Sequence, residues 1–162
     1  MKGQKDDRTN EIKEICYWYL ISKFFELFDT IFFVLRGKQS QVTFLHVYHH
    51  TNMAVSTWVF IRYNQGTQSM IMGACNSFVH VVMYAYYLLA ALGPSIQRYL
   101  WWKRYITVLQ IVQFLLILSY LCSLCFYGCR VGTVFIVFSA LNTLSFLVLF
   151  IHFYLKAYKK RK

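Results

Sequence analysis

Five apolar segments, each about as long as a bilayer core is thick, dominate this chain. An apolar run of about 20 residues is long enough to cross a membrane as a helix. Only 14% of the 162 residues are charged and 58% are hydrophobic, which leaves too little polar surface for a soluble domain. The sequence therefore predicts an all-α, multi-pass transmembrane helix bundle, with spans at residues 15–35, 42–61, 69–92, 105–126 and 131–155.

Basic residues near the segment ends predict how these helices are oriented. The net charge is +11, but the lysines and arginines are spread over segment ends, so membrane topology explains them better than nucleic-acid binding. The larger set, with Arg36, Lys103 and residues 156–162, should face the cytosol. We therefore expect three parts, namely a polar N-terminal segment (1–14), a transmembrane domain (15–155) and a basic cytosolic tail (156–162).

Three histidines interrupt the second apolar segment. His46, His49 and His50 are spaced at i, i+3 and i+4, so their imidazoles share one helical face. Hydrocarbon tolerates such groups poorly, and ionisable residues at membrane depth usually mark a functional site. The cluster therefore predicts a polar cavity or a catalytic centre.

The first apolar segment carries charged residues at a similar helical spacing. Lys23, Glu26 and Asp29 follow each other in steps of three, which keeps them near one side of a helix. A buried ion pair between Lys23 and Glu26 would be a purely structural explanation. The second acid, Asp29, exceeds what neutralisation requires and favours a functional role.

Polar stripes also run along the third and fourth segments. In the third, a lone histidine would more often be a hydrogen-bonded packing residue, and in the fourth the amides alone would be explained as bonds between helices. Taken together with the other two segments, however, they predict a polar chamber enclosed by the bundle and open to the cytosol. The stripe residues are Asn76, His80, Tyr84 and Tyr87 in the third segment and Gln110 and Gln113 in the fourth.

These four stripes resemble, in order, the motif boxes of the very-long-chain fatty acid elongase family. The first is similar to Lys-x-x-Glu-x-x-Asp-Thr (23–30) and the second to His-x-x-His-His (46–50). The third is similar to Asn-x-x-x-His-x-x-Met-Tyr-x-Tyr-Tyr (76–87), and the fourth to Thr-x-x-Gln-x-x-Gln (107–113). One box alone would be a weak signal, but four in order on successive segments are specific.

The resemblance implies the condensing reaction of fatty acid elongation. Acyl-CoA and malonyl-CoA would give a 3-oxoacyl-CoA two carbons longer, with carbon dioxide and CoA, and no cofactor or metal. His49 would be the nucleophile that forms an acyl-imidazole, with His46, His50 and His80 as the other catalytic histidines. Substrate-binding roles, which include holding an enolate and shaping the chamber and the apolar acyl tunnel, would belong to Lys23, Glu26, Asp29, Asn76, Tyr84, Tyr87, Gln110 and Gln113.

The resemblance also implies a location and partners. We expect the endoplasmic reticulum membrane, with the basic residues 159–162 as a di-lysine-like retrieval signal in the cytosol. The expected partners are membrane lipid and the reductase, dehydratase and enoyl reductase of the elongation cycle. A homodimer is left open, and no nucleic acid is expected. The box His-Val-Tyr-His-His resembles the branches that act on longer acyl chains.

Two features depart from the family pattern. Family members have seven spans and this chain offers five, so the two N-terminal spans would be missing. A lumenal disulfide of the family would involve Cys129, which would be unpaired here or would reach Cys16.

Two other functions stay open. A membrane di-iron desaturase or hydroxylase also uses His-x-x-His-His but needs about eight histidines, and this chain has five. An inactive or truncated relative could instead bind acyl-CoA without turning it over.

Overall fold

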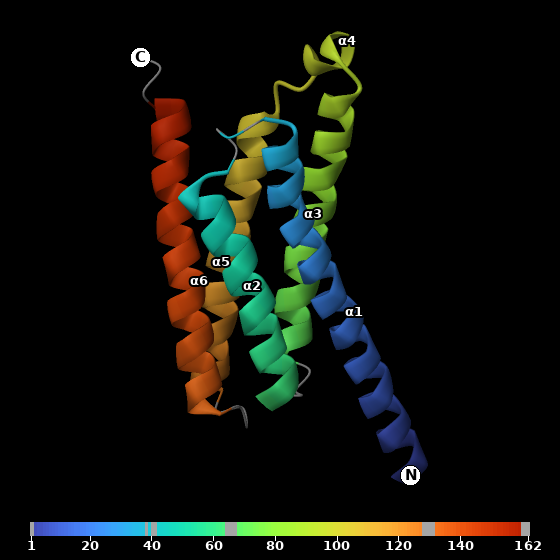
Figure 1. The fold of residues 1–162 in the computed structure, drawn as a ribbon. Helices are drawn as coiled ribbons and strands as arrows, with labels where there is room; N and C mark the ends of the chain where they lie inside the picture. The colour runs from blue at the N-terminus through green and yellow to red at the C-terminus, as the bar shows by residue number, and fades with distance from the viewer. Residues whose placement is uncertain (1, 38, 40–41, 64–67, 128–131, 160–162) are drawn as a thin grey trace. The chain divides into compact units, whose positions relative to one another are not determined.

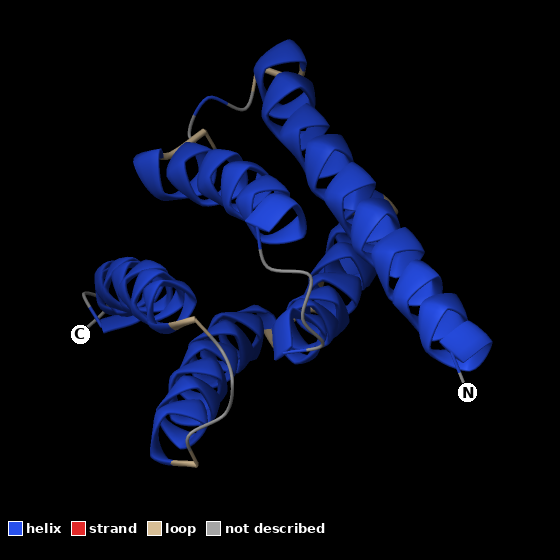
Figure 2. Ribbon diagram, turned by 90° about the horizontal axis from the view of Figure 1, so that it is seen from below, coloured by secondary structure: helices blue, strands red, loops and turns tan. Residues whose placement is uncertain are grey.

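The computed structural model describes residues 2–37, 39, 42–63, 68–127 and 132–159. Over these ranges all regular structure is helical and no strand occurs (Figure 2). The prediction of an all-α chain is therefore confirmed. The long helices, labelled in Figure 1, are α1 (Lys2–Leu35), α2 (Phe44–Tyr63), α3 (Gln68–Ala91), α5 (Lys103–Phe126) and α6 (Thr133–Tyr154).

The helices match the predicted apolar segments to within a few residues, except at the start of α1. This helix begins at Lys2, 13 residues before the predicted span, and has 34 residues. At 1.5 Å per residue it is about 51 Å long, whereas a bilayer core is about 30 Å thick. The polar residues 2–14 therefore continue the helix. The division into segments 1–14, 15–155 and 156–162 stays a prediction.

Two short elements accompany the long helices. The four-residue helix α4 (Pro94–Gln97) begins directly after Gly93, whose φ of 109° suits glycine because other residues rarely adopt it. Pro94 stands at the start of α4, where a proline costs no hydrogen bond. A π-helical turn, η2 (Leu155–Lys159), continues α6. The sequence analysis predicted no helix between the spans 69–92 and 105–126.

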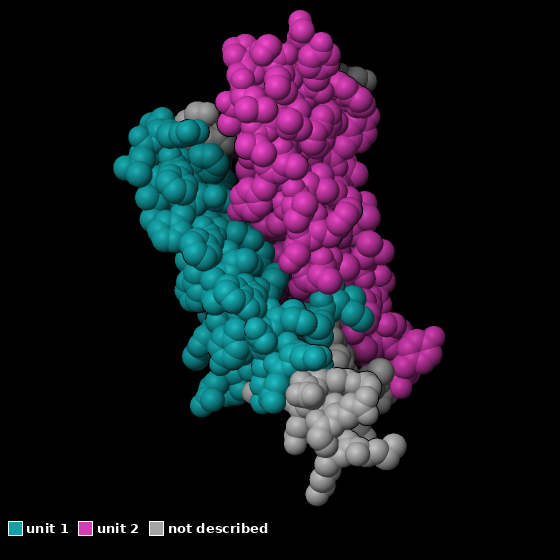
Figure 3. Space-filling model, turned by 90° about the vertical axis from the view of Figure 1, so that its right-hand side faces the viewer, with its two compact units in different colours: residues 1–71 teal, residues 72–162 magenta. Residues whose placement is uncertain are grey.

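The chain forms two compact units, coloured separately in Figure 3. In the first (Met1–Ile71), α1 packs against α2. In the second (Met72–Lys162), α5 packs against α6. There the buried ring of Phe114 lies 6.0 Å from the ring of Phe146 and 5.2 Å from that of Phe150. The enclosed chamber would involve residues of both units, and it stays a prediction.

Three described helices are long and apolar enough to cross a membrane: Ser69–Ala91, Lys103–Phe126 and Thr133–Tyr158. They correspond to three of the five predicted spans and support a multi-pass membrane protein. The predicted spans in α1 and α2 are not among these three, because the apolar part of α1 carries three charged residues and α2 carries the histidine cluster. Spanning by α1 and α2 stays a prediction.

Between residues 15 and 35, the exposed side of α1 is nevertheless largely apolar. Its buried positions include Lys23 and Glu26, whereas the large aromatic side chains between and beside them are exposed. This is the reverse of a soluble helix, in which charged residues are almost never fully buried unless paired. An apolar outer surface with a polar inner stripe suits a lipid surround. The exposed aromatic residues are Tyr17, Trp18, Phe24, Phe25, Phe28 and Phe32.

Candidate functional site

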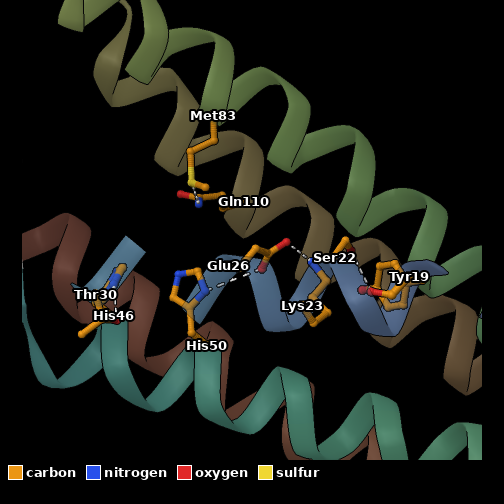
Figure 4. Close-up of polar contacts among 9 residues, drawn as sticks. All are labelled: Tyr19, Ser22, Lys23, Glu26, Thr30, His46, His50, Met83 and Gln110. Carbon is orange, nitrogen blue, oxygen red and sulfur yellow. Dashed lines mark hydrogen bonds and ion pairs between the residues drawn. The ribbon is translucent and has the colours of Figure 1, made fainter. Parts of the chain in front are cut away.

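The charged stripe of α1 is buried against α2 in the first unit. Lys23 donates from Nζ to Oε1 of Glu26 over 2.5 Å, one helical turn away (Figure 4). The side chains are only 2% and 9% exposed. The ammonium also lies 4.9 Å from the centre of the Tyr19 ring, a cation–π contact. The structure thus confirms the ion pair that the spacing suggested, while Asp29 lies half-buried on the same helix.

Glu26 joins this ion pair to the histidine cluster on α2. Its second carboxylate oxygen, Oε2, lies 3.6 Å from Nδ1 of His50 (Figure 4). That distance is too long for a hydrogen bond, but it allows an ion pair whenever His50 is protonated. One carboxylate therefore faces a lysine on one side and a histidine on the other.

The three histidines of the cluster lie close together, as their spacing predicted. The ring centre of His50 lies 4.5 Å from that of His46 and 5.3 Å from that of His49. His49 and His50 are buried, and His46 is half-buried. Nucleophile and proton-transfer roles both need such imidazoles close together and shielded from water.

His46 has a partner that sequence reasoning did not include among the site residues. Oγ1 of Thr30 lies 3.1 Å from Nε2 of His46, at hydrogen-bond distance (Figure 4). Thr30 follows Glu26 by four residues, so it lies on the same face of α1. This spacing of four residues was the signal in the sequence that could have identified Thr30 as a site residue. Glu26 and Thr30 of α1 thus contact His50 and His46, the two histidines beside His49.

α2 also carries polar residues that the sequence analysis did not single out. Ser56 donates from its hydroxyl to Oδ1 of Asn52 over 3.1 Å. Ser56 and Thr57 are 2% and 6% exposed. Their spacing of about seven from the histidine pair continues the same helical face, and this signal was present in the sequence.

The polar stripe of α3 lies in the second unit and becomes more exposed along the helix. Asn76 and His80 are buried, whereas Tyr84 is half-buried and Tyr87 is 43% exposed. The ring of Tyr84 lies 5.9 Å from that of His80 and 6.0 Å from that of Tyr87. The helix thus arranges the predicted residues as one continuous aromatic and polar stripe.

The two glutamines of α5 belong to the same unit. Gln110 donates from Nε2 to the sulfur of Met83 on α3 over 3.7 Å (Figure 4). Thioether sulfur is a weak acceptor. Gln113 is 5% exposed. The α5 stripe is thus partly buried and touches the α3 stripe at Met83.

No group of three or more His, Cys, Asp or Glu side chains that could hold a metal ion occurs in the described part of the chain. A reaction without metal stays a prediction.

The cysteines and the basic tail are only partly described. Cys129 and residues 160–162 lie outside the described residues. Whether Cys129 is unpaired or reaches Cys16 therefore stays a prediction.

Several curated proteins that are similar to this chain are named very long chain fatty acid elongases. A very long chain fatty acid elongase of Aedes aegypti is 45% identical over 155 residues, which cover 96% of this chain and 43% of that protein. Very long chain fatty acid elongase 7 of Drosophila melanogaster is 47% identical over 149 residues, covering 91% and 45%. Very long chain fatty acid elongase 4 of Homo sapiens is 41% identical over 164 residues, covering 98% and 52%.

The chain spans about half the length of these relatives. No solved structure matches it. The model of the GNS1/SUR4 family matches residues 2–162, and that match includes all four motif stripes described above. With relatives named as elongases covering nearly the whole chain, the resemblance seen in the motifs is confirmed, and the chain belongs to the GNS1/SUR4 (ELO) family.

Proposed function

We propose that this chain carries the condensing activity of very-long-chain fatty acid elongation. The observation that supports it most is the histidine cluster of α2, buried against the charged stripe of α1. The family membership and the names of the relatives support the same activity. The substrates are an acyl-CoA and malonyl-CoA.

In the first step, a ring nitrogen of His49 attacks the thioester carbonyl of the acyl-CoA. A carbon–nitrogen bond forms, the carbon–sulfur bond breaks, and CoA leaves as the thiolate, which takes up a proton. The acyl-imidazole divides a difficult condensation into two easier steps. The burial of His49 limits hydrolysis of this intermediate by water.

In the second step, malonyl-CoA loses carbon dioxide, and the electron pair of the broken bond forms an enolate. Its carbon attacks the acyl carbonyl, the carbon–nitrogen bond to His49 breaks, and the leaving imidazolate of His49 takes up a proton. The product is a 3-oxoacyl-CoA two carbons longer. Hydrogen-bond donors stabilise the enolate oxygen in such reactions, and we assign this role to Asn76 and His80 of α3.

We assign substrate contacts to Tyr84, Tyr87, Gln110 and Gln113, and an electrostatic role in the site to Asp29. The proposed location is the endoplasmic reticulum membrane, where the reductases and dehydratase of the cycle would process the product. These assignments are supported by the family alone.

The test is elongation by the chain in microsomes that lack endogenous elongases. Labelled malonyl-CoA is supplied with a series of acyl-CoAs of different length. We expect incorporation of label that is lost in His49→Ala and kept in the matched control His152→Ala. His152 is exposed near the end of α6. Absence of incorporation by folded chain would refute the proposal.

The same assay distinguishes the alternatives. An acyl-CoA-binding protein without turnover would retain acyl-CoA but would release no labelled carbon dioxide from malonyl-CoA that is labelled at its free carboxyl group. A di-iron enzyme would purify with stoichiometric iron and would lose its activity when the iron is removed. Either result would contradict the condensing reaction.

A further inference from the structure

A contact within α1 and a contact between α1 and α2 form a line from Lys23 through Glu26 to His50 (Figure 4). All three side chains are buried. We propose that Glu26, held by Lys23, is a positioning residue that fixes the ring protons of His50. Lys23 then acts through Glu26 and not by touching substrate. This inference deepens the proposed function and rests on it.

The chemistry of a carboxylate decides which nitrogen of His50 carries the proton. An ionised carboxylate only accepts hydrogen bonds. Neutral His50 therefore carries its proton on Nδ1, which faces Oε2 of Glu26 at 3.6 Å, and keeps the lone pair on Nε2. Catalytic hydrogen bonds are often long without substrate and shorten in the complex. Glu26 thus makes Nε2 the basic nitrogen of His50.

A basic nitrogen next to the nucleophile completes the first step of the proposed reaction. When His49 attacks the thioester, its other ring nitrogen must lose a proton to give a neutral acyl-imidazole. Nε2 of His50 accepts that proton and afterwards gives it to the leaving CoA thiolate. His50 returns to its neutral form with the proton on Nδ1.

Lys23 keeps His50 able to accept this proton. With Lys23 on Oε1, the carboxylate is already balanced by one positive charge at 2.5 Å. Without Lys23, the bare carboxylate would stabilise the protonated imidazole, which has no lone pair to offer. Two further titratable groups among the described residues lie near His50, namely His46 and His49, whose ring centres are 4.5 Å and 5.3 Å from its own.

Steady-state kinetics against pH, in the microsomal assay, test the coupling between Lys23 and Glu26. We expect Glu26→Gln to lower kcat about tenfold or more with little change in KM, because the proton-transfer geometry is lost. Lys23→Met should lower kcat and move the acid limb of the kcat profile to higher pH. In the Glu26→Gln background, Lys23→Met should cause no further loss.

Opposite outcomes would overturn the inference. If Lys23 contacts substrate directly, Lys23→Met will raise KM with kcat unchanged. Losses that multiply in the double variant would show that the two residues act independently. Lys13→Met is the matched control, because it removes a half-buried lysine from the same helix, and it should change neither constant.

Nitrogen-15 NMR of histidine-labelled chain tests the inference without any activity. His50→Gln assigns the signals, and we expect the proton of neutral His50 on Nδ1. In Lys23→Met/Glu26→Leu, both tautomers should appear. A proton on Nε2 in the unaltered chain would overturn the inference. Because this readout needs no turnover, a chain that incorporates no label would refute the proposed function while this measurement still decides the tautomer.

Discussion

Replacing Glu26 by leucine should show how much stability is lost when the buried Lys23 is left without its partner. The change removes the partner of Lys23, whose side chain is 2% exposed and whose ammonium lies 2.5 Å from the carboxylate. Removing one partner of a buried pair typically costs about 3–5 kcal/mol, because a charge is left uncompensated. The remaining contact to the Tyr19 ring, at 4.9 Å, offsets part of this cost.

The chemistry of lysine sets an upper limit on this loss in the free energy of unfolding. The unpaired ammonium can give up its proton, which costs about 4.6 kcal/mol at pH 7 and about 1.9 kcal/mol at pH 9 relative to a lysine in water. The folded variant then holds fewer protons than its unfolded state, so its stability rises with pH. We therefore expect a loss of about 3–4.6 kcal/mol at pH 7 that falls to about 1.9 kcal/mol or less at pH 9.

Unfolding in mixed micelles with a rising fraction of dodecyl sulfate, followed by tryptophan fluorescence, measures the free energy of unfolding at both pH values. Lys23→Met/Glu26→Leu should recover most of the stability, since apolar residues of similar volume often replace a buried pair without loss. Glu14→Leu, an exposed site on the same helix, is the control and should stay within about 0.5 kcal/mol. A loss that is the same at pH 7 and pH 9, or no loss, would refute the reasoning.

Three further substitutions probe single contacts with the same titration. Thr30→Val keeps the shape but removes the 3.1 Å contact to Nε2 of His46, and should cost about 1 kcal/mol, whereas Thr30→Ser should cost less. Phe114→Ala opens a cavity beside Phe146 and Phe150 and should cost about 3 kcal/mol. The control Phe126→Ala, at a residue that is 87% exposed, should cost about 0.5 kcal/mol. Equal losses in the two variants would contradict the packing of Phe114. Gln110→Leu should change stability by less than about 1 kcal/mol, because the sulfur of Met83 is a weak acceptor, and a larger loss would reveal a stronger bond.

The helical class and most helix ends were predictable because apolar runs and their breaks are local signals. The start of α1 at Lys2 was not, since hydropathy marks where a helix could enter a membrane and not where the helix begins. The four residues of α4 are likewise too few to produce a periodic pattern.

Within the site, spacing along one helix predicted which side chains share a face. It placed Lys23 beside Glu26 and brought the three histidines together. It did not predict that Glu26 faces His50 or that Thr30 faces His46, because these contacts depend on the register of α1 against α2. No pattern within a single helix contains that register.

Both α1 and α2 bury polar residues, which are charged in α1 and include histidines in α2. Three of the described helices are apolar enough to span a membrane, and α1 and α2 are not among them. The ion pair lies in α1 and the histidine cluster lies in α2. In α1 and α2 the buried residues include Lys23, Glu26, His49 and His50. An average or a count over the whole helix therefore includes polar residues that do not contact the surrounding medium. Between residues 15 and 35, the exposed surface of α1 is largely aromatic and apolar. The buried charges of α1 therefore do not indicate a water-exposed helix, and they agree with the site that we propose, since ionisable residues at membrane depth usually have a function.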